Sequence, residues 1–99
     1  MDCQNCSVRK TVRDEEQKKK LINRLSRIEG QIRGLKTMME NDCYCNDILI
    51  QSSAVSQALY SFEKEVLRSH MHTCVVKDIR EGHDEVVDEL LETIHKLMR

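Results

Sequence analysis

The 99-residue sequence contains no proline and only three glycines, and aromatic residues make up 3% of it. β-Sheet domains are rich in aromatic and β-branched residues, and their many turns use glycine and proline. This composition therefore argues against a sheet sandwich and favours long helices joined by short loops. Such an elongated chain has a small core of its own, so we expect it to bury its apolar stripes against other copies of itself.

Three further absences narrow the possible functions. No apolar run approaches 18 residues, so no membrane span or membrane partner is expected. The segment Met1–Cys6 lacks the apolar core of a signal peptide. We therefore expect a cytoplasmic protein, whose five cysteines are thiols for metal or redox chemistry and not a disulfide framework. No catalytic Ser/His/Asp pattern or phosphate loop is evident, so the protein is not expected to be an enzyme.

The longest periodic pattern lies between residues 15 and 40. Its apolar residues recur at spacings of three and four, which predicts an amphipathic helix packed on other helices. They are Leu21, Leu25, Ile28, Ile32, Leu35 and Met39. Gly30 and Gly34 interrupt this pattern at a cost of about 1 kcal/mol each relative to alanine. We interpret the two glycines as marks of a close helix crossing or a bend.

Two breaks divide the rest of the chain. Residues 41–44 form the first break, after which Asn46 or Asp47 is expected to cap a second helix that runs to about Val76. Residues 81–84 form the second break, and a third helix follows. The apolar face of this third helix contains Val87, Leu90, Leu91, Ile94, Leu97 and Met98.

Charge is distributed unevenly along the chain. Residues 1–36 carry a net charge of +5, whereas residues 37–99 carry −6. Such asymmetry indicates a polyanionic partner for the basic part, the alternative being a solvated helix face beside a frayed tail. We expect a flexible tail over residues 1–14 and a single helical domain over residues 15–99.

Three residues with metal-binding side chains have an informative spacing. His70 and Cys74 are four residues apart, so on a helix they share one face. Cys45 lies 25 positions before His70, which on one straight helix is roughly 37 Å. Since metal–ligand bonds are about 2.0–2.3 Å long, either the chain folds back or Cys45 meets His70 and Cys74 of a second chain. An antiparallel dimer would form two equivalent sites of this kind.

Two thiolates and one imidazole form a soft ligand set, which selects Cu(I), Zn(II) or Fe–S clusters. Zn(II) generally takes a fourth ligand, so three ligands with no evident fourth suit Cu(I) better. The pairs Cys3/Cys6 and Cys43/Cys45 each resemble part of a metal site, but no second half is evident. We interpret Cys3, Cys6 and Cys43 as accessory thiols.

Several motifs together resemble one known family. In chain order they are Asn23–Gly34 (NRLSRIEGQIRG), Tyr44–Leu49 (YCNDIL), Gln51 with Ala54–Val55, His70-x3-Cys74-Val75 and Glu89–Leu91 (ELL). These motifs are collinear over roughly residues 17–98. They resemble those of the copper-sensitive operon repressor family (CsoR/RcnR type), and in particular its Cu(I)-sensing members.

The resemblance implies a three-helix protomer, an antiparallel four-helix-bundle dimer and a dimer of dimers. It implies a repressor that binds operator DNA without a helix-turn-helix and releases it when an inducer binds. Cu(I) would be bound by Cys45 of one chain and by His70 and Cys74 of its partner, with Tyr44 and Glu89 linking metal binding to DNA release. The candidates for phosphate contacts, which make affinity depend on salt, are Lys18, Lys19, Lys20, Arg24, Arg27 and Arg33.

Other inducers and another class of function are the alternatives. Nickel or cobalt sensors of the family use more histidines, including one near the N-terminus, whereas this chain has none before His70. Formaldehyde sensors rely on an N-terminal proline, which is absent. Persulfide sensors keep the equivalents of Cys45 and Cys74 but lack the histidine, so His70 favours copper while the surplus thiols favour persulfide. The alternative from another class is a helical bundle that buffers metal and does not bind DNA. The basic charge of residues 1–36 argues against this alternative.

Overall fold

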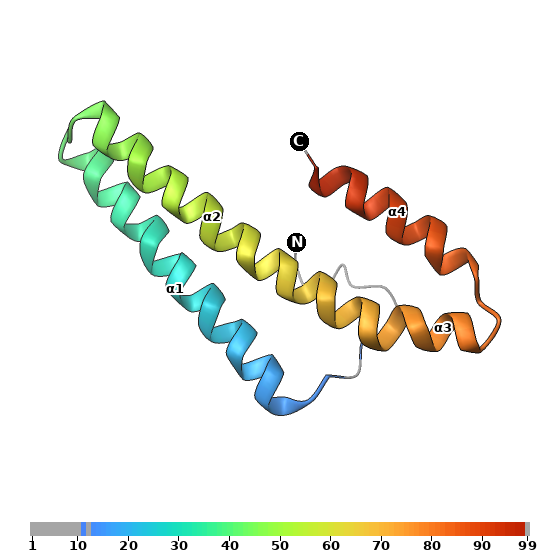
Figure 1. Cartoon of the computed structure of the whole chain (residues 1–99). Helices are drawn as coiled ribbons and strands as arrows, with labels where there is room; N and C mark the ends of the chain where they lie inside the picture. Colours follow the sequence, from blue (N-terminus) through green and yellow to red (C-terminus); the bar gives the residue numbers. More distant parts are fainter. Residues whose placement is uncertain (1–10, 12, 99) are drawn as a thin grey trace. The chain divides into compact units, whose positions relative to one another are not determined.

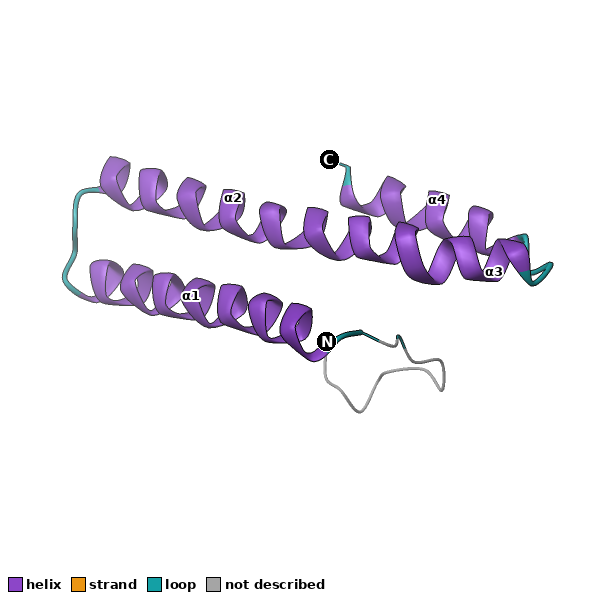
Figure 2. Cartoon of the chain, turned by 60° about the horizontal axis from the view of Figure 1, so that its bottom comes forward, coloured by secondary structure: helices purple, strands orange, loops and turns teal. Residues whose placement is uncertain are grey.

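The computed structural model describes residue 11 and residues 13–98, and every regular element among them is helical. The elements in chain order are α1 (Glu15–Glu40), α2 (Cys45–His70), the π-helical turn η2 (Met71–Val75), α3 (Val76–Arg80) and α4 (Glu85–Leu97) (Figure 1). Because α2, η2 and α3 follow one another without a break, they form one helical segment. The described chain thus has three helical segments joined by two loops (Figure 2), and the prediction of an all-α, three-helix protomer is confirmed.

Helix α1 begins where the sequence predicts, at Glu15. The carboxylate of Asp14 accepts the backbone N–H of Gln17 at 2.8 Å, which satisfies one of the free donors at the helix start. Asp14 is therefore the N-cap of α1 and not part of a loose tail. Of the tail predicted before this cap, residues 1–10 and 12 lie outside the described part of the chain.

The chain forms two compact units, and the first, which ends at Glu63, is a hairpin of α1 and the larger part of α2. The two helices run antiparallel and side by side (Figures 1 and 2). One set of α1 residues, spaced by seven, is buried or half-buried: Leu21, Ile28 and Leu35. A second set with the same spacing stays exposed: Leu25, Ile32 and Met39. A single chain therefore covers only half of the apolar stripe that the sequence predicts.

Helix α2 begins at Cys45, earlier than the sequence predicts. The backbone N–H groups of Asp47 and Ile48 already donate to the carbonyl of Tyr44 at 3.0 and 3.2 Å. Asn46 and Asp47 therefore lie inside the first turn, and the prediction that either residue caps the helix is wrong. Asp47 still suits this position, because its negative charge complements the positive end of the helix dipole.

The second unit begins at Lys64 and contains the end of α2, η2, α3 and α4. Its core, with the residues that pack against it, consists of Val75, Val86, Leu90, Leu67 and Ile94. The chain reverses direction between α3 and α4 through Gly82, which has a φ of +84° that favours glycine. The turn lies within the predicted break at residues 81–84. The core of this unit thus joins η2 to α4.

The second helical segment departs from the prediction near its end. The sequence predicts an α-helix to about Val76, whereas α2 ends at His70 and a π-helical turn leads into α3, which ends at Arg80. A π-turn replaces the i→i+4 hydrogen bonds of an α-helix by i→i+5 bonds, and it occurs mostly as a single turn within longer helices. The spacing of apolar residues does not reveal such a turn.

The glycines of α1 mark no close helix crossing in the described chain. A Cβ atom placed on Gly34 would meet nothing within 4 Å, and one placed on Gly30 would meet only the guanidinium group of Arg33, at 3.8 Å. Both glycines lie inside an uninterrupted α-helix. Their interpretation as packing residues therefore finds no support within a single chain.

Candidate functional site

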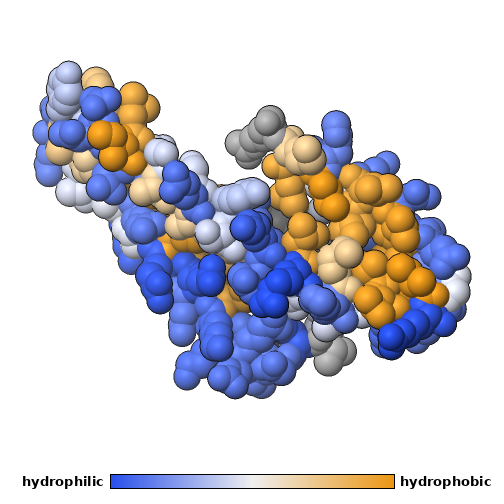
Figure 3. Space-filling view, in the orientation of Figure 1, coloured by the Kyte–Doolittle hydropathy of each residue, from blue (hydrophilic) through white to orange (hydrophobic). Residues whose placement is uncertain are grey.

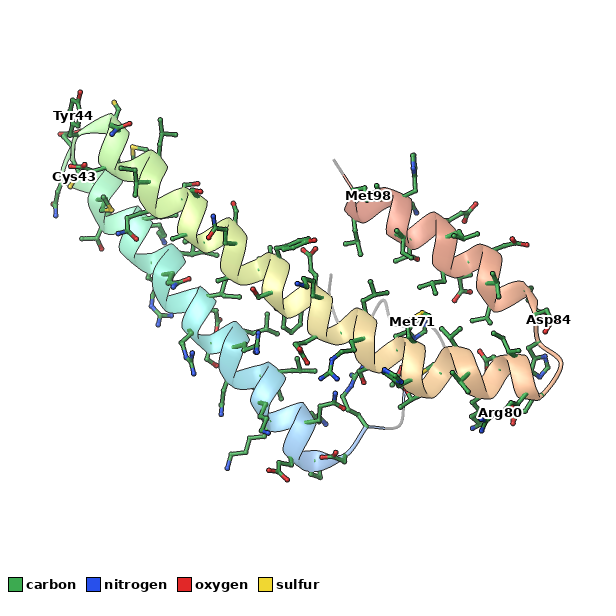
Figure 4. All side chains as sticks on the ribbon, in the orientation of Figure 1. Cys43, Tyr44, Met71, Arg80, Asp84 and Met98 are labelled. Carbon is green, nitrogen blue, oxygen red and sulfur yellow. The ribbon has the colours of Figure 1, made fainter. Side chains whose placement is uncertain are left out.

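Cys45 is the first residue of α2, and its side chain is exposed. Tyr44 before it is 73% exposed and stands at the tip of the α1–α2 loop, where Cys43 also lies (Figure 4). Cys43 is half-buried, and both it and Cys45 are free thiols. This end of the hairpin thus presents one exposed thiol, that of Cys45, to its surroundings. Cys3 and Cys6 lie outside the described residues.

His70 is the last residue of α2, and Cys74 lies inside η2. Both side chains are half-buried, and the chain between them stays helical, so the two donors belong to neighbouring turns of one segment. Met71 marks the start of this turn in Figure 4. Val75, which is 3% exposed, anchors the turn in the core of the second unit. The helical setting that the four-residue spacing requires is therefore present.

A hydroxyl group that the sequence analysis did not single out lies beside Cys74. The hydroxyl of Thr73 donates a hydrogen bond to the carbonyl oxygen of Ser69 at 2.7 Å, and its oxygen is 3.6 Å from the sulfur of Cys74. Ser69 is buried, with 9% of its surface exposed. The only sequence signal for this contact is a threonine four residues after a small residue, a pattern that many helices contain.

The three predicted ligands do not come together as one site in the described chain. Cys45 and His70 are the first and last residues of the same α-helix. Within the described residues, no three His, Cys, Asp or Glu side chains gather in a way that would hold a metal ion. Glu89, the predicted coupling residue, is exposed on α4, and its backbone carbonyl accepts a hydrogen bond from the hydroxyl of Thr93 at 3.1 Å.

The basic residues expected to contact DNA are all exposed on α1: Lys18, Lys19, Lys20, Arg24, Arg27 and Arg33. Lys20, Arg24 and Arg27 are spaced by four and three residues, so they form a stripe on one face of the helix. Arg33 lies six residues beyond Arg27 and is turned by about 240° from it. Figure 3 shows hydrophilic residues over the first part of α1 and hydrophobic residues over α4. The six residues thus belong to more than one helix face.

Comparison with known proteins identifies the class to which this arrangement belongs. The chain matches the model of the metal-sensitive transcriptional repressor family over residues 17–96. It is 42% identical to the copper-sensing transcriptional repressor CsoR of Bacillus subtilis (strain 168) over 88 residues, which cover 88% of this chain and 87% of that protein. It is 39% identical to the copper-sensing transcriptional repressor RicR of Mycobacterium tuberculosis over 84 residues, with coverages of 85% and 88%.

Solved structures show the same fold. The crystal structure of the copper-sensing repressor CsoR with Cu(I) from Geobacillus thermodenitrificans NG80-2 matches with a TM-score of 0.86 and 40% identity, over 91% of this chain and 95% of that one. The nickel-responsive transcriptional regulator InrS matches with a TM-score of 0.72 and 39% identity, over 89% and 100% of the two chains.

The fold and the sequence matches together define a metal-sensing, DNA-binding regulator. The chain belongs to the metal-sensitive transcriptional repressor family, as its motifs predict, and its relatives include copper sensors. This family is one of transcriptional repressors and not of enzymes. Among the described residues, no helix has the length and apolar character that a membrane crossing requires.

Proposed function

We propose that this protein is a Cu(I)-responsive repressor that binds operator DNA in its metal-free form and releases it when Cu(I) is bound. The observation that carries this proposal is the pair His70 and Cys74 on one helical segment, with Cys45 at the other end of α2, in a chain of the metal-sensitive repressor family. We expect the protein to act in the cytoplasm, where it meets its operator.

The donor set fits Cu(I). Cys45, His70 and Cys74 supply two sulfur atoms and one imidazole nitrogen, and soft thiolate ligands select Cu(I). The similarity to a nickel-responsive regulator makes nickel the competing metal. Nickel(II) favours tetragonal sites built from nitrogen and oxygen donors, so a set with two sulfurs favours copper. When bound, Cu(I) would link the two elements that carry these residues, α2 and η2.

Two chains are needed to build this site. A straight helix keeps Cys45 and His70 roughly 37 Å apart, so we assign Cys45 to one chain and His70 with Cys74 to its partner. The exposed α1 residues Leu25 and Ile32 supply an apolar stripe that an antiparallel four-helix-bundle dimer would bury. We propose a homodimer with two such sites and a homotetramer of two dimers, in which residues 15–99 act as one domain.

The DNA-binding surface in this proposal is the basic part of α1. The stripe Lys20, Arg24 and Arg27 would neutralise phosphates, with Lys18, Lys19 and Arg33 adding contacts from neighbouring faces. Metal binding weakens DNA binding only if the metal and the DNA favour different conformational states of the assembly. We assign this coupling to Tyr44, next to a ligand, and to Glu89 on α4.

The test is release of DNA by two inducers in parallel. A duplex that the metal-free wild type selects from a random-sequence pool is titrated anaerobically with Cu(I) or with a persulfide donor, and binding is followed by fluorescence anisotropy. We expect Cu(I) to release the duplex from the wild type and from His72→Ala, the matched control with an exposed histidine. We expect His70→Ala to keep its DNA when Cu(I) is added.

Two results would contradict the proposal. If His70→Ala releases DNA with Cu(I) as the wild type does, the imidazole of His70 is not needed for the response to Cu(I). If only the persulfide donor acts on the wild type, the protein is a reactive-sulfur sensor that uses Cys45 and Cys74. Failure of the wild type to select any duplex would favour a metal-buffering role.

A further inference from the structure

Thr37, Thr73 and Thr93 make the same kind of contact, in which the side-chain hydroxyl donates to the backbone carbonyl four residues earlier. Thr37 bonds to Arg33 at 3.2 Å in α1, and Thr93 bonds to Glu89 at 3.1 Å in α4. Both of these hydrogen bonds are exposed. The third, from Thr73 to Ser69, is shorter at 2.7 Å and partly buried, and it lies across the start of η2. Thr73 is itself exposed, so this bond differs from the other two in its short length and its buried acceptor, Ser69.

The third hydrogen bond runs parallel to the proposed ligand pair. Ser69 directly precedes His70, and Thr73 directly precedes Cys74. The bond thus joins the residues next to the two ligands across the same turn. The oxygen of Thr73 also lies 3.6 Å from the sulfur of Cys74. A hydroxyl has one proton, and the shorter of its two contacts is the hydrogen bond to the carbonyl of Ser69.

The hydrogen bond of Thr73 lies where the helix changes from α to π geometry. In a π-turn the regular i→i+4 ladder is displaced, and side chains that bond to carbonyls inside a helix often accompany a local bend. On the other side of the same turn, Val75 is held in the core by Val86 and Leu90. The turn that carries Cys74 is therefore fixed from two directions, by a hydrogen bond at Thr73 and by apolar packing at Val75.

We propose that Thr73 is a positioning residue of the metal site, whose hydroxyl holds the π-turn and thereby sets the sulfur of Cys74 relative to the imidazole of His70 before the metal arrives. This inference rests on the proposed function, because it assumes that His70 and Cys74 bind one ion together. Partners outside the ligands commonly change metal affinity by about 10–100-fold when removed. Loss of this hydroxyl is expected to weaken Cu(I) binding by about tenfold.

The experiment compares four proteins under anaerobic conditions. The wild type, Thr73→Val, Thr73→Ser and Thr37→Val are titrated with Cu(I) in competition with a chromogenic chelator. Valine keeps the shape of threonine without its hydroxyl, and serine keeps the hydroxyl. Thr37→Val removes the matched hydrogen bond from α1, a helix that carries none of the three proposed ligands. We expect about tenfold weaker binding for Thr73→Val only.

A second measurement needs no metal. Hydrogen–deuterium exchange of the metal-free proteins reports the backbone over residues 69–80. We expect faster exchange there in Thr73→Val and exchange like that of the wild type in Thr73→Ser, with unchanged helix content by circular dichroism. If exchange depended on the size of the side chain and not on its hydroxyl, Thr73→Ser would not keep exchange like that of the wild type.

The outcomes separate this inference from the proposed function. If the wild type does not bind Cu(I), the proposed function fails, and the exchange data alone decide whether the hydroxyl holds the turn. If the wild type binds Cu(I) and Thr73→Val binds it equally well, the positioning role of Thr73 is overturned while the metal site stands. Equal losses in Thr73→Val and Thr73→Ser would also overturn the role of the hydroxyl.

Discussion

The backbone N–H of Cys43 donates a hydrogen bond to the carbonyl oxygen of Met38 at 3.0 Å. The N–H of Asp42 bonds to the carbonyl of Met39 at 3.2 Å, and Asp42 has a φ of +54°. These two bonds define a Schellman motif, which ends α1 and directs the chain into α2. Glycine is the usual residue at the left-handed position of this motif. Asp42 occupies it at a conformational cost, directly before Cys43.

Replacing Asp42 by glycine is expected to stabilise the protein. An L-residue in the left-handed region costs about 1–2 kcal/mol, although aspartate tolerates the region better than most. We expect Asp42→Gly to raise the free energy of unfolding by about 0.5–1 kcal/mol in urea denaturation followed by circular dichroism. Asn41→Gly is the control, because Asn41 has a φ of −92° and gains nothing from glycine. An unchanged free energy of unfolding in Asp42→Gly would mean that interactions of the aspartate side chain offset the cost of its left-handed backbone.

Replacing Gly82 and Gly34 by alanine, one at a time, is expected to change the free energy of unfolding in opposite directions. An alanine Cβ meets nothing within 4 Å at either Gly82 or Gly34, so neither substitution creates a clash. Gly82 has a φ of +84°, and Gly82→Ala is expected to lose about 1 kcal/mol of unfolding free energy. Gly34 lies inside α1, and Gly34→Ala is expected to gain up to about 1 kcal/mol from helix propensity. A loss for Gly34→Ala would show that another molecule approaches α1 there.

Most of the fold could be predicted from the sequence because its helices are strongly periodic. The first helix begins at Glu15 as predicted, since a regular apolar stripe runs along it, whereas its cap, Asp14, falls in the predicted tail. The π-turn at residues 71–75 could not be predicted, because the spacing of apolar residues does not distinguish a π-turn from the α-helix around it. The start of α2 lies earlier than predicted, because Asn46 and Asp47 have side chains that suit a cap but here lie within the first turn of the helix.

Self-association is expected to depend on the exposed half of the α1 stripe. Burying a leucine or isoleucine side chain contributes about 1.5–3 kcal/mol, so the double substitution Leu25→Ser and Ile32→Ser is expected to raise the dimer dissociation constant at least about tenfold. Sedimentation velocity over a range of concentrations measures this shift. Lys36→Ser, an exposed polar substitution on the same helix, is expected to leave the sedimentation unchanged. Sedimentation of the double variant like that of the wild type would place the subunit interface elsewhere.

The candidate site divides into a part that spacing predicts and a part that it does not. A four-residue interval places His70 and Cys74 on neighbouring turns of any helix, so their setting could be predicted. The contact of Thr73 with Ser69 and Cys74 needs atomic positions, because threonine makes this type of bond in many helices. The assignment of Cys45 to a partner chain stays a prediction, because it depends on how two chains meet.

Binding of DNA through the α1 stripe predicts a specific dependence on salt. Each phosphate contact releases condensed counterions, so log K falls with log salt by about 0.9 for every phosphate neutralised. Arg24→Ala and Arg27→Ala each remove one arginine from the stripe and are each expected to lower the slope of this plot by about one. The measurement is fluorescence anisotropy of a selected duplex at several salt concentrations. The matched control is Lys96→Ala, which removes one exposed positive charge from α4 and is expected to leave the slope unchanged. Equal changes of slope in all three variants would mean that affinity follows net charge alone, and the assignment of the DNA surface to α1 would then be wrong.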